Sequence, residues 1–185
     1  EWINHSLRAH HADSVEPRVL IGEGQCEKPY SSSLLNISAM SFGSLSSHAV
    51  EALSSGAKAG GFAHNTGEGG ISKYHRAGGA DLIWQIGTGY FGCRKADGTF
   101  DPELFAEKAT DEQVKMIELK LSQGAKPGHG GILPAGKLTP EIAEIRHVPL
   151  GEDVLSPPAH SSFTTPREML SFLDELRRLS GGKPV

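Results

Sequence analysis

Blocks of apolar residues alternate with longer amphipathic stretches along the chain, which predicts strands alternating with helices. Short apolar runs typical of buried strands occur at residues 34–40, 62–64, 81–86, 114–121 and 153–156. Apolar residues recur at helical spacing, behind Ser, Thr or Pro start signals, at 46–59, 102–109, from 139 onward, and at 165–179. Residues 1–33 are polar and turn-rich, and we expect them to form an N-terminal segment across one end of the unit at 34–185.

This alternation is typical of a parallel α/β sheet, either doubly wound or closed as a (β/α)₈ TIM-type barrel. Glycine-rich or polar loops follow four of the predicted strands, and a barrel gathers such loops at its carboxyl-end face. A doubly wound sheet would concentrate them at one switch point, and no G-x-G-x-x-G follows the first strand. The pattern favours the barrel. About five strands are visible, so we expect only the N-terminal part of an eight-stranded barrel.

The two ends of the chain suggest a piece of a longer protein. No methionine begins it, and Gly181-Gly182 followed by Lys183-Pro184-Val185 is typical of a helix end passing into another strand. We therefore expect a fragment truncated at its C-terminus and inactive on its own.

Composition excludes several classes of function. The 185 residues, 37% of them hydrophobic, can bury one sizeable core. A net charge of −4 argues against nucleic-acid binding, and no apolar stretch approaches the length of a membrane-spanning helix. The distant pair Cys26 and Cys93 predicts no disulfide framework, and the histidine spacing predicts no metal site. A reducing cytoplasm fits these features best.

The loop at 123–131 carries the strongest local signal. It follows the predicted strand at 114–121 and combines four glycines in eight residues with Lys126. Glycines allow close approach of the backbone or positive φ, and such a loop can offer N–H groups and a fixed cation to an anionic ligand. The alternative is an ordinary turn with a surface lysine.

Four segments resemble the FMN-binding synthase domain of glutamate synthase, in the same order and with similar spacing. They are Ile-Ser-Ala-Met-Ser-Phe-Gly-Ser-Leu-Ser at 37–46, Asn-Thr-Gly-Glu-Gly-Gly at 65–70, Gln-Gly-Ala-Lys-Pro-Gly at 123–128 and Ser-Pro-Pro-Ala-His at 156–160. The likeness is greatest to stand-alone glutamate synthase-like proteins. It implies a (β/α)₈ barrel that binds FMN and reductively aminates 2-oxoglutarate with ammonia, through 2-iminoglutarate, to L-glutamate.

The resemblance also implies partners outside this chain. These are an electron donor, an amidotransferase subunit as a possible ammonia source, and a 3Fe–4S cluster on cysteines that the family carries later in its sequence.

Flavin-binding roles follow from the same match. It implies that Ala39, Met40 and Ser41 lie against the isoalloxazine ring, with Gln85 and Thr88 at its pyrimidine edge. Lys120 matches a lysine near N1–C2=O, where reduction places negative charge that a cation stabilises. Core packing is the plain alternative for Met40.

Substrate and catalytic roles fall on four polar residues. Gln123, Lys126 and Arg146 match positions that bind 2-oxoglutarate, since amides and cations suit its carboxylates and keto oxygen. Lys126 and Glu68 are the catalytic candidates, with Glu68 orienting substrate or moving a proton. Glu68 could equally hold its own loop, and Arg146 could be a solvated helix cap.

Two positions depart from the family pattern. Ile132 stands where the family has glutamine, and His129 where an acidic residue is usual. Loss of an amide donor leaves open an FMN barrel with related chemistry, such as N-methylglutamate synthesis. A non-catalytic barrel module is a further alternative. His64 and His160 come at or near strand ends, where they could line the site.

Overall fold

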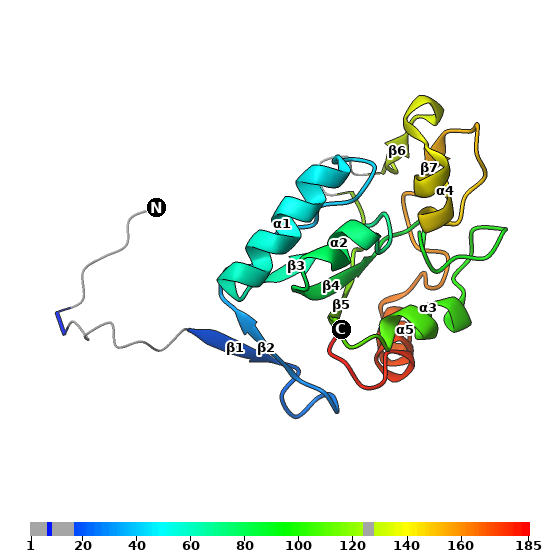
Figure 1. Ribbon diagram of the computed structural model, residues 1–185. Coiled ribbons are helices and arrows are strands. Elements are labelled where there is room, and N and C mark those ends of the chain that lie inside the picture. Colours follow the sequence, from blue (N-terminus) through cyan, green and yellow to red (C-terminus); the bar gives the residue numbers. More distant parts are fainter. Residues whose placement is uncertain (1–6, 9–16, 124–127) are drawn as a thin grey trace.

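A computed structural model describes residues 7–8, 17–123 and 128–185 of the chain. Within these residues a three-stranded parallel sheet has the order β3 (Ala63–Asn65), β4 (Asp81–Ile86), β5 (Val114–Leu119) (Figure 1). Ile37 forms an isolated parallel bridge with His64 beside β3. The Ile117 N–H donates to the Pro184 carbonyl at 3.0 Å beside β5. The array thus follows chain order from residue 37 to residue 184, and the described residues form no closed barrel.

The predicted helices are confirmed, because their start and stop signals act locally. Ser46 caps α1 by accepting from the Ala49 N–H, and Gly61 ends this helix at φ +67°. The other three long helices each begin with a proline directly after an Asp or Thr cap. The bounds are α1 (Ser47–Gly60), α3 (Pro102–Ala109), α4 (Pro140–Arg146) and α5 (Pro166–Leu179).

The two faces of the parallel sheet differ in character, because successive strand residues point to opposite sides. One face carries the apolar side chains Leu82, Trp84 and Ile117, which pack in one cluster with side chains of α3 and α5. Trp84 stacks on Phe105 with ring centroids 5.2 Å apart. The other face carries Ile83 and, two residues further along β4, the amide of Gln85. The helix-covered face therefore provides the main core, and the opposite face is apolar at Ile83 but becomes polar at Gln85, toward the carboxyl ends of the strands.

An antiparallel hairpin of β1 (Arg18–Ile21) and β2 (Tyr30–Ser33) precedes the sheet, where the polar pattern predicted no strand. Tyr30 packs with Ala63 and Ile83, and its hydroxyl donates to Asp81 at 3.0 Å. Ala63 and Asp81 are the first residues of β3 and β4, so Tyr30 lies at the amino ends of these strands. The sequence pattern did not predict these strands because each is only four residues long and β2 is rich in serine.

The strand predicted at 34–40 is wrong, since only Ile37 forms a bridge there. The side chain of Asn36 accepts from the Ala63 N–H at 2.9 Å and takes the place of a backbone rung. The strand predicted at 153–156 exists as β7 (Val154–Leu155), but it pairs antiparallel with β6 (Ile132–Leu133) outside the parallel sheet. The pattern also missed the short helix α2 (Lys73–Ala77) and the 3-10 turn η1 (Ala135–Lys137).

His64 is a fully buried histidine whose two ring nitrogens have no hydrogen-bond partner. It lies on β3 with its ring centroid 5.2 Å from that of His75. Burial, together with the neighbouring His75, lowers the pKa of His64 from 6.5 to about 4. His64 is therefore neutral at pH 7 and belongs to the core, rather than lining the site as its place on the strand suggested.

We expect this histidine to make the fold sensitive to acid. The unfolded chain binds a proton at His64 below pH 6.5, whereas the folded chain does so only near pH 4. The stability linked to His64 is complete above pH 6.5 and falls by about 2 kcal/mol between pH 7 and pH 5. Chemical denaturation of wild type and His64→Leu at both pH values should show a smaller loss in the variant. An equal loss of unfolding free energy in both proteins would contradict a lowered pKa at His64.

Candidate active site

A network of three polar side chains joins the loops that follow β3 and β5. Lys120 Nζ lies 3.2 Å from Glu68 Oε2 and 3.1 Å from Gln123 Oε1. Gln123 Nε2 donates to both Glu68 oxygens at 2.8 Å. The side chains of Lys120 and Glu68 are 28% and 19% exposed, so the pair is sheltered but reachable from solvent. A carboxylate, an ammonium and an amide thus meet at the carboxyl ends of the parallel strands.

The hydrogen bonds of Glu68 show which segments its carboxylate joins. Among the described residues, its carboxylate accepts from the side chains of Lys120 and Gln123. It therefore ties its loop to the segment after β5, rather than holding its own loop through backbone N–H groups.

Gln85 lies on β4, close to the carboxyl end of the strand. Its side-chain amide donates to Glu118 Oε1, and the two residues are direct partners in the β4–β5 register. The sequence interpretation gave Glu118 no site role. The spacing of Glu118 could have indicated a site role. It lies two residues before Lys120, and residues two apart along an extended chain lie on the same face.

The segment Ala39-Met40-Ser41 lies beside the 65–70 loop. The Met40 N–H donates to the Asn65 carbonyl at 3.2 Å, and the Met40 carbonyl accepts from His75 Nε2 at 2.8 Å. An ideal Cβ on Gly67 would lie 2.7 Å from the Ser41 nitrogen, so glycine permits this approach. Ala39 is exposed and Met40 only half-buried, which argues against core packing for Met40.

Arg146 ends α4 but is not a solvated cap, since it is only 5% exposed. Its Nη2 donates to the Phe42 carbonyl at 3.3 Å, and its guanidinium lies 5.2 Å from the centroid of the Phe91 ring. Its Nε is buried without a hydrogen-bond partner. Burial lowers the pKa of Arg146, and the Glu68 carboxylate opposes that shift. A cavity of about 110 Å³ is lined by Ser41, Ser44, Glu68, Phe91, Ile132 and Arg146.

Thr88 and His160 make hydrogen bonds within the protein. Thr88 Oγ1 donates to the Pro157 carbonyl at 2.6 Å. His160 Nε2 lies 2.8 Å from the Lys120 carbonyl, and its Nδ1 lies 3.0 Å from the Tyr90 hydroxyl. Burial lowers the pKa of His160. The structure thus brings the loop at 156–160 against the end of β5, with the His160 ring next to the Lys120 carbonyl.

The glycine-rich loop is described at Gln123 and from Gly128 onward, and Lys126 lies outside the described residues. Gly128 has φ +76°. An ideal Cβ on Gly130 would lie 1.5 Å from the Ser156 carbonyl oxygen, and the Gly131 N–H donates to Ser156 Oγ at 2.8 Å. These two glycines let the loop approach the backbone of this chain, a packing role that the sequence interpretation did not assign to them.

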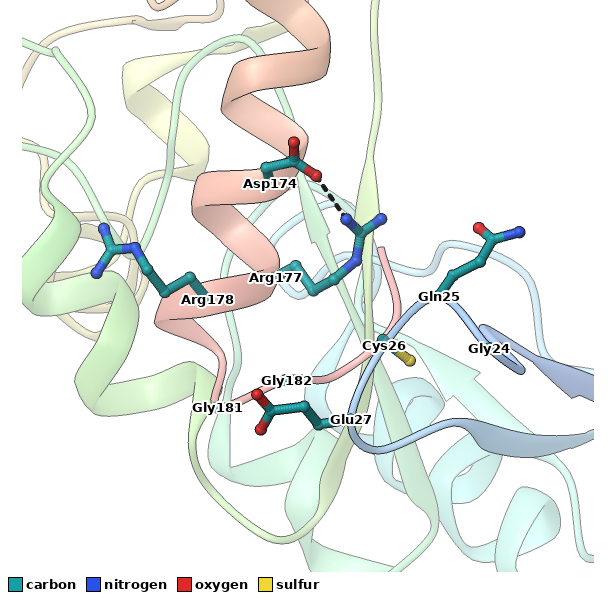
Figure 2. A pocket seen from close by; sticks show the side chains of 9 residues that line it. All are labelled: Gly24, Gln25, Cys26, Glu27, Asp174, Arg177, Arg178, Gly181 and Gly182. Atoms are coloured by element: carbon teal, nitrogen blue, oxygen red, sulfur yellow. Dashed lines mark hydrogen bonds and ion pairs between the residues drawn. The ribbon is translucent and has the colours of Figure 1, made fainter.

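A larger hollow of about 580 Å³ lies where the turn between β1 and β2 meets the end of α5 (Figure 2). Within it Arg177 is paired with Asp174 at 2.6 Å, and nearby the Lys28 N–H donates to the Gly182 carbonyl at 2.8 Å. None of the predicted site residues that the structure describes lines this hollow. Its place beside the segment that precedes Pro184 sets it apart from the polar network.

Comparison with known proteins identifies the family. The family described as "Conserved region in glutamate synthase" matches residues 3–185. The chain belongs to the glutamate synthase family. It is 50% identical over 177 residues to the glutamate synthase large subunit-like protein YerD of Bacillus subtilis (strain 168). It is 39% identical over 150 residues to the archaeal-type glutamate synthase [NADPH] of Thermotoga sp. (strain RQ2).

The matches cover much of this glutamate synthase family chain but little of each relative. The alignments span 95% of the chain and 33% of the Bacillus protein, and 80% of the chain and 27% of the Thermotoga protein. The chain therefore spans a third or less of the length of these two relatives. No helix within the described residues is both long enough and apolar enough to cross a membrane.

We expect Gly130→Ala to disturb the packing of the glycine-rich loop against Ser156. The added Cβ collides with backbone, which cannot swing aside as a side chain can. A loss of about 2–3 kcal/mol in unfolding free energy should follow, with faster hydrogen exchange at the Ser156 N–H, which is bonded to Gly131. Gly136→Ala is the matched control, because its Cβ meets nothing within 4 Å. Equal effects of the two substitutions would refute the packing role.

Proposed function

We propose that this chain is part of an FMN-dependent, glutamate synthase-like oxidoreductase. In this proposal the enzyme reductively aminates 2-oxoglutarate to L-glutamate through 2-iminoglutarate. The observation that carries it is the Glu68–Lys120–Gln123 network, which meets the 39–41 segment and Arg146 at the carboxyl ends of parallel strands. Family membership and the names of the relatives support the reaction.

The proposed architecture is the N-terminal part of a (β/α)₈ barrel, with residues 1–33 as a segment across one end. The chain-order succession from residue 37 through β3, β4 and β5 to residue 184 supports it. Tyr30 packs at the amino ends of the strands, and the polar network lies at the carboxyl ends. Barrel enzymes place their active sites at the carboxyl end.

The described residues suit the ring of a flavin. Ala39 is exposed beside Met40 and Ser41, Gln85 brings a side-chain amide, and Lys120 is the cation. Thr88 would act at the pyrimidine edge as an acceptor only, since its proton goes to Pro157. FMN, when bound, supplies the hydride equivalent. Lys120 would stabilise negative charge at the flavin N1–C2=O.

A dicarboxylate substrate would compete with Glu68 for the side-chain amide of Gln123. This amide donates to the Glu68 carboxylate, and in the proposal a substrate carboxylate takes the place of Glu68 there. Arg146, buried beside the cavity, would fix a second carboxylate. Glu68, once displaced, would be available to orient the amine or to move a proton. Lys126 completes the proposed set from outside the described residues.

The partners of the full protein are part of the proposal. The name of the Thermotoga relative includes NADPH, which supports a nicotinamide-derived reductant. Ammonia would come from solution or from an amidotransferase subunit. A 3Fe–4S cluster would be held by residues outside this chain.

A second candidate function is the use of an alkylamine, as in N-methylglutamate synthesis. Ile132 is 57% exposed and lines the cavity that also contains Glu68 and Arg146. An isoleucine at this point gives the cavity an apolar wall that could accept a methyl group but cannot donate a hydrogen bond.

Lys120→Met should impair flavin reduction in the full-length protein more than it impairs folding. Loss of the cation removes about 1.5–3 kcal/mol of stabilisation from the reduced, anionic flavin. For a two-electron couple this lowers the midpoint potential by about 30–60 mV. Redox titration of the bound flavin measures this shift.

Lys115→Met is the control for Lys120→Met, because Lys115 is the second residue of β5, away from the network, whereas Lys120 directly follows the end of this strand. Its flavin should titrate as in wild type. An unchanged potential in Lys120→Met at full FMN occupancy would remove Lys120 from the flavin site. Absence of FMN from the wild-type protein would instead favour the non-catalytic module.

Ile132→Gln should shift the choice of amine toward ammonia. A restored amide donor favours the smaller, more polar amine, and the ratio of kcat/KM for ammonia to that for methylamine should rise about tenfold. Leu155→Gln is the matched control, because Leu155 pairs with Ile132 in the β6–β7 ribbon but does not line the cavity. A ratio that moves equally in both variants would argue against a specificity role for Ile132.

A further inference from the structure

His75 is a buried histidine outside the proposed set of site residues, and it contacts the segment proposed to face the flavin. It occupies the third position of α2, directly after the Ser72 cap. Its Nδ1 lies 3.1 Å from the Ser72 nitrogen and 2.8 Å from Ser72 Oγ. Its Nε2 lies 2.8 Å from the Met40 carbonyl oxygen. One imidazole therefore bridges a helix start and the 39–41 segment.

These contacts fix the tautomer of the ring. A backbone N–H can only donate, so the Ser72 nitrogen requires Nδ1 to be an acceptor without a proton. The single proton of the neutral imidazole then lies on Nε2, and this group donates to the Met40 carbonyl. An imidazolium would direct an N–H at the Ser72 N–H. The ring is therefore neutral, accepts a hydrogen bond at Nδ1 and donates one from Nε2.

Hydrogen bonds to α1 and to Asn65 hold the two ends of this bridge in place. Ser54 Oγ on α1 donates to the His75 carbonyl at 2.7 Å and accepts from the Gly78 N–H at 3.1 Å. An ideal Cβ on Gly78 would lie 2.4 Å from the backbone of α1, so the two helices are in close contact. On its other side, Met40 donates through its N–H to Asn65 at 3.2 Å. Both peptide groups of Met40 are thus held.

We infer that His75 is a positioning residue that holds the Met40 carbonyl, and with it the backbone of residues 39–41, in the conformation that receives the flavin ring. This inference rests on the proposed function, since it requires FMN at that segment. His75 acts through Met40 and touches neither the flavin nor the substrate. Its removal should therefore alter flavin binding and the flavin spectrum while leaving the Glu68–Lys120–Gln123 network in place.

Two variants of the full-length protein separate positioning from helix capping. His75→Gln keeps a standard capping-box partner for Ser72 but loses the ring N–H that reaches Met40. We expect its FMN dissociation constant, measured by flavin fluorescence, to rise about tenfold, with a shifted visible absorption spectrum. Ser72→Ala loses the hydroxyl cap but keeps the backbone N–H that fixes the tautomer. We expect it to have a lower melting temperature, with wild-type FMN affinity and spectrum.

A measurement on the wild-type protein tests the inference even where His75→Gln does not fold. Long-range ¹H–¹⁵N correlation spectra should show the His75 ring neutral, with Nδ1 unprotonated and the proton on Nε2. The opposite tautomer, or wild-type flavin properties in folded His75→Gln, would overturn the positioning role. Failure of the wild-type protein to bind FMN would instead refute the proposed function, so the two failures are distinguishable.

Discussion

The parallel pairing of β4 with β3 on one side and β5 on the other is the constraint on which the rest of the structure depends. Parallel strands end at the same edge, so the loops after all three strands meet there. Glu68, Lys120 and Gln123 are separated by up to 55 residues in sequence, yet they form one hydrogen-bonded network. Alternation along β4 directs Trp84 into the helix-packed core and Gln85 to the opposite face.

Sheltered charge is the second organising feature. Lys120 and Glu68 are partly removed from water. The ion pair between them and their hydrogen bonds to Gln123 compensate for the lost hydration. Arg146 has a less complete set of partners, with one hydrogen bond to Phe42, the Phe91 ring beside it and a buried Nε without a partner. Groups held in this manner are poised to exchange partners, because an anionic ligand offers them what the protein supplies only in part.

Prediction from sequence succeeded where the signals were local. Ser46, Asp101, Thr139 and Thr165 each start a helix by satisfying its free N–H groups, an interaction within a few residues of sequence. It failed where pairing with distant segments decides the outcome. The apolar run at 34–40 reads as a strand, but the Asn36 side chain replaces a backbone rung. The serine-rich β2 reads as a turn, but it pairs along its length with β1.

The sequence by itself determined the four longer helices, the three central strands, and motifs that resemble those of the glutamate synthase family. Only the tertiary structure decided how these motifs meet. It showed that Gly130 serves an approach to Ser156, that Glu118 partners Gln85, and that His75 supports Met40. The physical reason is the range of the interactions. Caps and periodicity act within one or two turns of chain, whereas side-chain partners depend on strand register and loop placement, which no local pattern encodes.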